Sequence, residues 1–519
     1  MAQDKRSELS GEKRSDNSST LIAVSKISDK GVDILAGEDL DPVLEKKMSL
    51  VNDAIDEIGW TRYHTKLFFL NGFGYSVDSL VLLLQSVIAT QAFMEFGEVG
   101  FANALTIAVY VGMLVGALFW GTTADIIGRR LAFNTSLAIC SVAAAISAAM
   151  PNWPSLALFI SLIGFGAGGN LILDTTVFLE YLPGKKQWVL TLMAMWWGFG
   201  QAITGFIGWG FLVPAKWNCA SASNCGWRDN MGWRYVMITS GALVGVMSLL
   251  RITVIRLNET PKWLVANGRD ADVIAILHKI AAKYNRTCSL TIDQLEACGV
   301  IAGTTHNKRR LPLGESLVHI RGLFATRKLA LSTSLIWLSW AMMGLAYPLF
   351  YVFLPNYLAS RGATSNLSPS EVWRNYTLTN ISSIFGPVLA AVMCNIRLLG
   401  RKFTMTIGAF MTATFFFAYA SVHTPAQDVG FSCAIGFCLN VYYGVLYAYT
   451  AEVLPSAHRA TGDGVGVGFN RIMGIISAVI AAVADTSTTA PIFVCGALLV
   501  AIGVVSAVLP FEPYGHRSS

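Results

Sequence analysis

Three ionisable side chains lie inside long apolar stretches of the sequence, where they could carry protons or bind charged solutes. Asp78, Asp174 and Arg471 are each flanked on both sides by apolar residues. An ionisable group inside a membrane helix costs at least roughly 2.5–3.5 kcal/mol, so its retention suggests a function. A buried carboxylate can take up and release a proton, and a guanidinium group can neutralise an anionic solute or pair with a carboxylate. The alternative is an ion pair between helices that never contacts a solute.

Other residues suggest a pathway rather than a catalytic centre. No histidine lies well inside an apolar segment, so carboxylates would have to carry any coupled protons. Trp340 and Tyr347 are further candidates for lining a solute pathway, with lipid-facing or packing roles as the alternative for such aromatic residues. We see no nucleophile–base set, no nucleotide loop and no cysteine–histidine spacing for a metal, and therefore expect no enzyme, no metal and no cofactor. The glycine-rich run from Gly164 to Gly169 sits inside an apolar segment, which favours close helix packing over a dinucleotide loop.

The composition indicates where these residues must lie. Only 13% of the 519 residues are charged, 54% are hydrophobic, and the mean hydropathy is +0.52. Such a chain has too few polar residues to cover several soluble domains, which argues against a cytosolic enzyme, a nucleic-acid-binding protein and a disordered scaffold. We therefore expect the lipid bilayer to surround most of the chain.

From Lys66 onward the sequence contains twelve apolar segments of about the length needed to cross a bilayer. They are residues 66–90, 101–121, 131–150, 154–179, 188–213, 233–256, 329–354, 371–394, 402–422, 428–451, 461–484 and 489–509. Their continuous apolar character predicts helices, because strands of a membrane barrel would alternate in polarity. The predicted fold is an all-α membrane protein with two groups of six helices. Arg251, close to the end of the sixth segment, is expected to extend to the membrane interface.

Basic residues are concentrated in alternate loops, which predicts that both termini and the longest loop are cytosolic. Within that loop, residues 270–285 have apolar positions at helical spacing and predict a surface helix. The expected organisation begins with a disordered cytosolic arm (1–65), in which residues 49–60 are a candidate for a short amphipathic helix. A first six-helix half (66–256), a cytosolic linker (257–328), a second six-helix half (329–509) and a cytosolic tail (510–519) follow.

The loop after the second segment contains charges at a regular spacing. Gly121, Asp125, Gly128, Arg129 and Arg130 match the pattern G-x-x-x-D-x-x-G-R-R in full. This pattern resembles the signature of the major facilitator superfamily. Its glycines allow close helix approach, and its aspartate can pair with arginines, so we interpret it as a latch that favours one of two access states. A plain topology signal would need only the positive charges.

Further motifs resemble the sugar porters of that superfamily. Glu259 and Lys262 lie in the sequence Glu-Thr-Pro-Lys-Trp-Leu after the sixth segment, and Glu452 and Arg459 lie in its counterpart after the tenth. Glu180 lies in Phe-Leu-Glu-Tyr-Leu-Pro, which is similar to the branch related to synaptic vesicle two-related protein, especially its fungal members. We expect these three glutamates to pair with Arg130, Lys262 or Arg459 as gate elements. The resemblance implies alternating access and proton coupling.

The sequence also departs from the sugar-porter pattern. Arg397 stands where the second-half motif would have an aspartate, and the seventh segment lacks the paired glutamines that hold hexoses in sugar porters. The first difference implies a weaker or differently wired latch in the second half, and the second argues against a hexose substrate. Gln201 is similar in position to a glutamine by which the fifth helix of sugar porters contributes to binding.

Residues on the predicted outer face allow two modifications. Cys219 and Cys225 are six residues apart in an outward loop, where they form either a disulfide or two free thiols. Asn366 and Asn375 begin glycosylation sequons, although a proline follows the Asn366 sequon.

The function that we expect is secondary active transport of a small organic solute, such as an organic acid or ion, a sugar-like compound or a metabolite, driven by a proton gradient. An efflux carrier for a secondary metabolite and a non-transporting receptor or accessory protein remain alternatives. We expect a monomer in the plasma membrane or an organelle membrane, with a small-molecule solute and lipid as partners and no nucleic acid.

Overall fold

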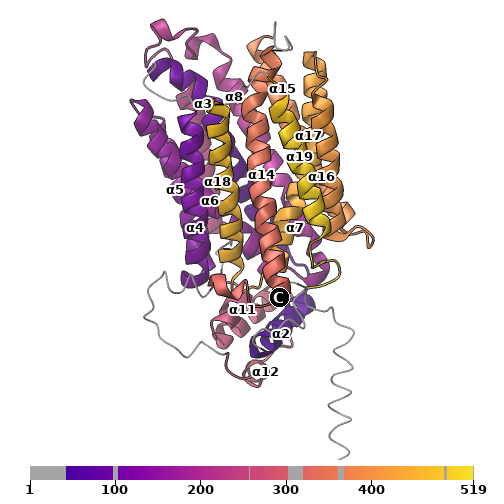
Figure 1. Cartoon of the computed structure of the whole chain (residues 1–519). Helices are drawn as coiled ribbons and strands as arrows, with labels where there is room; N and C mark the ends of the chain where they lie inside the picture. Colours follow the sequence, from indigo (N-terminus) through magenta and orange to yellow (C-terminus); the bar gives the residue numbers. More distant parts are fainter. Residues whose placement is uncertain are drawn as a thin grey trace, which may run out of the picture.

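A computed structural model describes residues 42–96, 103–255, 258–301, 319–360, 367–483 and 488–517, without the side chains of 125–127, 224, 254–255, 351–360 and 481–483. The regular elements of these residues are helices, and the long ones run side by side in one bundle (Figure 1). This arrangement confirms the predicted all-α membrane fold.

The first half of the bundle contains α3 (Arg62–Phe96), α4 (Ala104–Ile127), α5 (Arg129–Ser147), α6 (Trp153–Tyr181), α7 (Trp188–Met193), α8 (Met195–Leu212) and α9 (Gly232–Leu250). The π-helical turn η4 (Arg251–Ile255) extends α9, and the short 3-10 turns are η1 (Gly184–Lys186), η2 (Ala215–Trp217) and η3 (Ala222–Asn224). The fifth predicted segment is thus divided into α7 and α8, which meet at Ala194.

The second half contains α14 (Arg327–Ser360), α15 (Pro369–Cys394), α16 (Gly400–Tyr419), α17 (Pro425–Val453), α18 (Arg459–Val483) and α19 (Ala490–Ala507). Within the described residues, 11 helical spans are long and apolar enough to cross a membrane. The helix α16 is not among them, but it packs along α17 and α19 and completes the second group. The two halves meet mainly where α4 packs on α18 and α8 packs on α15.

Glycines allow these helices to approach closely. A Cβ atom on Gly112 of α4 would lie 1.9 Å from the carbonyl oxygen of Ser161, and one on Gly164 of α6 would lie 2.5 Å from that of Val109. Neither position can hold a larger side chain without moving a backbone. The glycine-rich run of α6 therefore serves helix packing, as its sequence context predicts.

Four short helices gather at one end of the bundle, which we call the linker end: α2 (Pro42–Ile58), α10 (Pro261–Ala266), α11 (Asp270–Lys283) and α12 (Ile292–Glu296) (Figure 1). The helix α11 matches the surface helix predicted over 270–285. The opposite end, which carries the loop between α8 and α9, we call the disulfide end.

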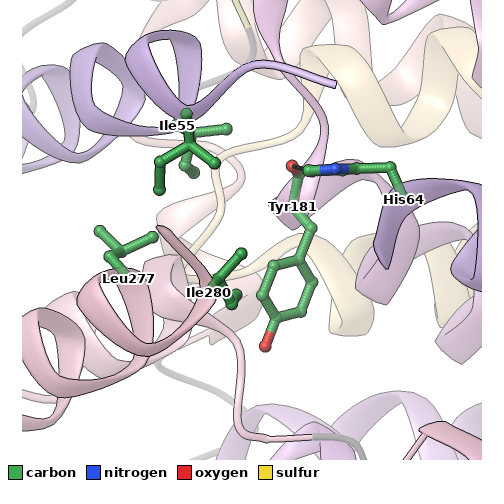
Figure 2. Close-up of a pocket in the computed structure, with 6 residues that line it drawn as sticks. Ile55, His64, Tyr181, Leu277 and Ile280 are labelled. Carbon is green, nitrogen blue, oxygen red and sulfur yellow. Dashed lines mark hydrogen bonds between the residues drawn. The ribbon is translucent and has the colours of Figure 1, made fainter. Parts of the chain in front are cut away.

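The predicted disorder of residues 1–65 is wrong for 42–58, which form α2, and for 62–65, which begin α3. The helix α2 contains most of the amphipathic helix considered for 49–60, and residues 1–41 lie outside the description. The apolar face of α2 is buried against its neighbours, and Ile55 lies beside Leu277 and Ile280 of α11 and Tyr181 of α6 (Figure 2). Lys47 Nζ lies 2.5 Å from Asp270 Oδ2. A partner supplied by the linker thus stabilises a helix that would be marginal alone.

Candidate functional site

Midway along their helices, Asp78 of α3 and Arg471 of α18 form an ion pair that joins the two halves. Arg471 Nη2 lies 3.7 Å from Asp78 Oδ1, and the two side chains are 4% and 0% exposed. The indole Nε1 of Trp197 in α8 donates a 3.0 Å hydrogen bond to Asp78 Oδ2. No hydrogen bond joins Arg471 to another described residue, and none reaches Asp78 Oδ1.

Two serines explain why Trp197 lies against Asp78. Ser76 and Ser79 of α3 donate hydrogen bonds of 2.6 and 2.8 Å to the carbonyl oxygens of Trp196 and Trp197. Because Gly200 of α8 has no side chain, its backbone can approach within contact distance of the Ser76 carbonyl. The small residues that flank Asp78 therefore hold α8 close to it.

Five rings beside this pair form what we call the aromatic cluster: Trp197 of α8, Trp340 and Tyr347 of α14, and Tyr443 and Tyr447 of α17. Neighbouring ring centroids lie between 4.6 Å apart, for Trp340 and Tyr447, and 6.4 Å apart, for Trp197 and Tyr347. All five residues are buried. The cluster thus draws on both halves of the bundle.

Polar contacts fix two of these rings. Gln201 Nε2 donates a 3.3 Å hydrogen bond to the Tyr347 hydroxyl, and Trp340 Nε1 donates a 3.1 Å bond to Thr450 Oγ1. The structure thereby brings together five predicted pathway residues, which are Asp78, Gln201, Trp340, Tyr347 and Arg471.

Sequence reasoning missed Tyr443 and Tyr447. They are four residues apart in α17 and so share one helix face. That spacing, in a segment predicted to cross the membrane, was the signal that could have identified them.

Asp174 belongs to a separate group of buried side chains. Both of its carboxylate oxygens accept hydrogen bonds of 2.6 and 2.8 Å from Arg251 Nη2. Arg251 Nη1 also donates to Asn170 Oδ1 at 2.6 Å and to the Phe133 carbonyl at 3.2 Å. The expectation that Arg251 extends to the interface is therefore wrong, because its side chain is 1% exposed and points to α6.

Charged residues also tie the halves together at the linker end. Arg129 Nη1 lies 2.8 Å from Glu180 Oε2, and Arg459 Nη1 lies 3.5 Å from Glu180 Oε1. Arg129 Nη2 donates a 3.0 Å hydrogen bond to the carbonyl oxygen of Ser456 in the second half. Since all three charged side chains are fully buried, this group closes the linker end.

The partners of two gate glutamates match the expected ones only in the Glu180–Arg459 pair. Glu180 pairs with Arg129 and Arg459, whereas Arg130 is exposed and contributes only its backbone amide, 3.4 Å from Glu259 Oε2. Glu259 Oε1 accepts a 2.9 Å bond from the Arg129 amide.

Glu452 of α17 binds a partner that was not predicted. Its two oxygens accept hydrogen bonds of 3.0 and 2.9 Å from Arg401. Glu512, which sequence reasoning missed, accepts bonds of 2.9 and 3.0 Å from the amides of Arg401 and Lys402. This repeats in the second half what Glu180 and Glu259 do in the first. The signal was Glu512-Pro513 after the last helix, similar to Glu-Thr-Pro after the sixth.

The remaining motif residues are placed as follows. Gly121 lies against the Ala460 carbonyl of α18, and Gly128 has a φ of 109° beside Glu259. Lys262 is buried in α10. The backbone of Asp125 ends α4, but its side chain lies outside the description, so the predicted latch contacts of Asp125 stay a prediction.

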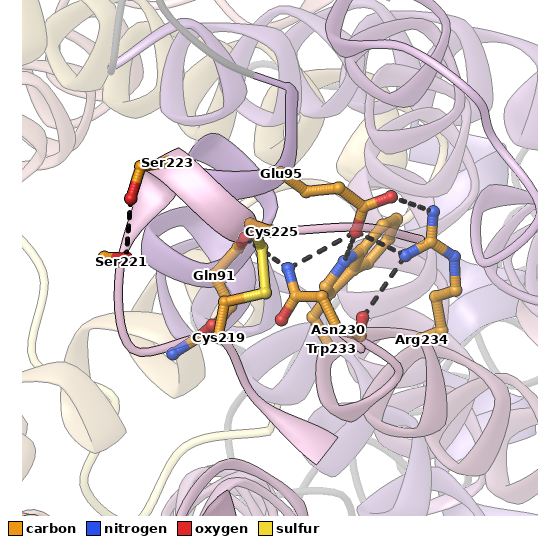
Figure 3. The surroundings of a disulfide bond; sticks show 9 residues. All are labelled: Gln91, Glu95, Cys219, Ser221, Ser223, Cys225, Asn230, Trp233 and Arg234. Atoms are coloured by element: carbon orange, nitrogen blue, oxygen red, sulfur yellow. Dashed lines mark hydrogen bonds and ion pairs between the residues drawn. A yellow bond between two sulfur atoms is a disulfide. The ribbon is translucent and has the colours of Figure 1, made fainter. Parts of the chain in front are cut away.

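At the disulfide end, Cys219 and Cys225 are joined in a disulfide (Figure 3). Nearby, Glu95 at the end of α3 accepts two 2.6 Å bonds from Arg234 and one of 2.9 Å from Trp233 Nε1. This group connects α3 with α9. Asn375 lies half-buried near the start of α15, and Asn366 lies outside the described residues.

Comparisons with known proteins agree with this architecture. A model of the Major Facilitator Superfamily matches residues 67–478. An uncharacterized MFS-type transporter of Schizosaccharomyces pombe is 37% identical over 94% of this chain and 92% of its own length. MFS siderochrome iron transporter 1 of Ceriporiopsis subvermispora is 37% identical over 92% of this chain and 93% of its own length.

The predicted branch and fold also have counterparts. A synaptic vesicle 2-related protein of Xenopus laevis is 25% identical over 90% of this chain and 82% of its own length. The structure of the proton:xylose symporter XylE bound to 6-bromo-6-deoxy-D-glucose superposes with a TM-score of 0.67 at 15% identity, over 88% of this chain and 98% of that one. The chain therefore belongs to the major facilitator superfamily and is a membrane transporter.

Proposed function

We propose that this protein is a secondary active transporter that moves a small organic solute by alternating access and couples the movement to protons at Asp78. The observation that carries this proposal is the buried Asp78–Arg471 pair, which lies between the halves and lacks a hydrogen bond between its partners. A charge pair held only at 3.7 Å is more easily separated than a hydrogen-bonded one. Protonation of Asp78 would neutralise it and release Arg471.

The surroundings of Asp78 support this role. Arg471 faces it from α18, and Tyr110 of α4, Tyr447 of α17 and Cys140 of α5 are close enough to interact electrostatically. From α8 the neighbour is the indole of Trp197, which does not titrate.

Two further titratable groups, Tyr75 and Asp174, lie close enough to Asp78 to interact with it electrostatically. Tyr75 of its own helix bonds Thr175 at 2.6 Å, and Asp174 of α6 is held by Arg251. Because Arg251 already satisfies both oxygens of Asp174, we assign proton uptake to Asp78 alone.

We further propose that the linker end faces the cytosol. Arg129, Arg130, Lys185 and Lys186 in the first half, and Arg401 and Lys402 in the second, lie at this end, as positively charged loops do in the cytosol. The disulfide at the opposite end fits an oxidising compartment.

Proton flux in proteoliposomes tests the proposal. The purified full chain is reconstituted with a pH-sensitive dye inside, and gradients of benzoate, glucose, choline and ferrichrome are applied in turn. We expect one solute class to drive proton movement in the wild-type protein. Asp78→Asn should lose this proton movement while it still exchanges the same solute, and Asp272→Asn, in the exposed linker, should behave as wild type.

Two results would count against the proposal. Unchanged solute-driven proton flux in Asp78→Asn would remove Asp78 from the coupling mechanism. A solute that binds but is never exchanged by the wild-type protein would favour the receptor alternative.

A further inference from the structure

Arg471 differs from three other arginines that are buried in the helical bundle. Arg251, Arg129 and Arg401 each donate hydrogen bonds of 3.0 Å or less to a carboxylate on a neighbouring helix. Arg471 is as deeply buried, yet its ion pair with Asp78 is 3.7 Å long, and it donates no hydrogen bond within the described part of the chain. The other three arginines are hydrogen-bonded to their carboxylates, whereas Arg471 is not.

A guanidinium group presents five N–H donors in a plane and has no acceptor. Leaving such donors unsatisfied in a buried position is unfavourable, because the group has lost its water and gained nothing in return. The ligand that best satisfies them is a carboxylate, whose two oxygens match two parallel N–H groups of the guanidinium fork.

Asp78 cannot serve fully as that ligand in this arrangement. Its Oδ2 atom already accepts the Trp197 indole hydrogen bond, and Oδ1 lies 3.7 Å from Arg471 Nη2, beyond hydrogen-bond distance. Arg471 therefore lacks an anion, and Asp78 Oδ1, which accepts no hydrogen bond, is the oxygen that would take up the proton. A cation would find one partly occupied carboxylate, and it would also meet the positive charge of Arg471.

The aromatic cluster defines the rest of the ligand. Trp197 bridges Asp78 and the rings of Tyr347, Tyr443 and Tyr447. Tyr443 and Tyr447 lie close enough to Arg471 to interact with it electrostatically. Flat rings with offset and edge contacts favour another flat ring over a branched aliphatic group of similar size.

We propose that the central site binds a small aromatic monocarboxylate, with its carboxylate on Arg471 and its ring among Trp197, Tyr443 and Tyr447. This inference rests on the proposed transport function, because it assigns the substrate class of the same site. A single negative charge suffices: once Asp78 is neutral, one carboxylate balances Arg471, and a second would be left without a partner.

Equilibrium binding of radiolabelled benzoate to the purified full chain tests the inference. Benzoate should bind saturably. Benzamide, which has the same ring without the charge, should compete about ten- to a hundredfold more weakly, as expected for the loss of a hydrogen-bonded charge. Cyclohexanecarboxylate, which has the charge without the aromatic ring, should be about two- to tenfold weaker. Phenyltrimethylammonium should not displace benzoate.

Paired variants test separately whether Arg471 binds the carboxylate of the ligand and whether Tyr443 contacts its ring. Arg471→Gln should weaken benzoate binding about tenfold or more, and Arg471→Lys should restore part of it, because a point charge remains but the fork is lost. Tyr443→Leu should weaken binding, whereas Tyr443→Phe, which keeps the ring, should not. Arg269→Gln, on the exposed linker, is the control for purification and labelling, and gel filtration checks that each variant is folded.

Several results would overturn the inference. Wild-type benzoate affinity in both Arg471 variants would remove Arg471 from the site, and equal affinity for cyclohexanecarboxylate would remove the aromatic requirement. Tighter binding of phenyltrimethylammonium would assign the site to organic cations. If glucose, choline or ferrichrome drives proton flux while benzoate neither binds nor is exchanged, the substrate class is wrong and the transport function stands. If no solute drives proton flux or exchange, the transport function itself fails.

Discussion

The buried arginines of this protein fall into two kinds, according to whether a carboxylate satisfies their guanidinium donors. Arg251 shares both oxygens of Asp174 and also bonds Asn170, so its charge is fully compensated. Arg471 is compensated only by a longer contact with Asp78. The first kind is suited to stability and the second to exchange of partners, because Arg251 is hydrogen-bonded to its carboxylate and Arg471 is not.

The Asp174–Arg251 pair should therefore behave as a structural unit. Asp174→Asn or Arg251→Gln alone should lower the free energy of unfolding by about 3–5 kcal/mol, because each leaves one buried charge without its counterion. The double variant should lose less than the sum of the two, which denaturation in mild detergent would measure. The matched exposed pair, Arg269 and Asp272, is about half exposed and should change stability by under about 1 kcal/mol. Additive losses in the buried pair would contradict this assignment.

Whole helices are positioned by small residues as much as by charges. The helices α4 and α6 approach until the Gly112 backbone touches the Ser161 carbonyl, and α3 and α8 approach through Ser76 and Gly200. The second of these contacts sets the distance between Asp78 and Trp197. Helix packing thereby determines the geometry of the central site.

Enlarging Gly112 should separate α4 from α6. A single Cβ atom at Gly112 would already lie 1.9 Å from a carbonyl oxygen, and Gly112→Val adds two methyl groups there. We therefore expect the free energy of unfolding to fall by about 1–3 kcal/mol or more. Gly210→Ala in α8 is the control, because a Cβ atom there would meet nothing within 4 Å. Thermal unfolding of the two purified variants would separate the effects. Equal melting temperatures would mean that this close approach is not essential.

At the scale of the molecule, contacts between the halves surround the central site from both ends. The linker end is closed by Glu180 with Arg129 and Arg459, and by the bond from Arg129 to the Ser456 carbonyl. Toward the disulfide end, Trp209 of α8 donates a 3.1 Å hydrogen bond to Ser370 of α15. Alternating access requires these two sets of contacts to break in turn.

Neutralising Glu180 should favour opening of the linker end. Glu180→Gln removes about 2 kcal/mol of charge-assisted bonding from the closed state, which corresponds to a population shift of more than about tenfold. A cysteine at Ala460, fully buried between the halves, should then react faster with maleimide. If the linker end is cytosolic, the faster labelling should be seen in whole cells only with a membrane-permeant maleimide, or after the cells have been opened.

The control for this measurement is Glu371→Gln, which changes a residue of the capping box at the start of α15. Glu371 lies in the first turn of α15, next to Ser370 at the disulfide end, and its substitution should leave the labelling rate unchanged. A variant of Glu180 that labels no faster than this control would mean that Glu180 does not hold the closed state.

Local patterns in the sequence determined the membrane environment, the helices and the family. Hydropathy over about 20 residues identifies a membrane helix because every backbone group bonds within the segment itself. The motif around Gly128 could be recognised for the same reason, since its residues are neighbours in the chain. The surface helix over 270–285 was likewise predictable from its own periodicity.

Only the tertiary structure decided which charges meet. Asp78 and Asp174 are equivalent by sequence, since both are acids inside apolar segments, yet one faces an incompletely bonded arginine and the other a complete partner. Glu452 likewise bonds Arg401 rather than Arg459, which is nearer to it in the sequence. Pairing depends on the rotation of each helix and on neighbours distant in the chain, and no local pattern encodes either. The same reason explains why α2 is ordered, because its partner α11 lies more than two hundred residues away in the chain, as the Lys47–Asp270 pair shows.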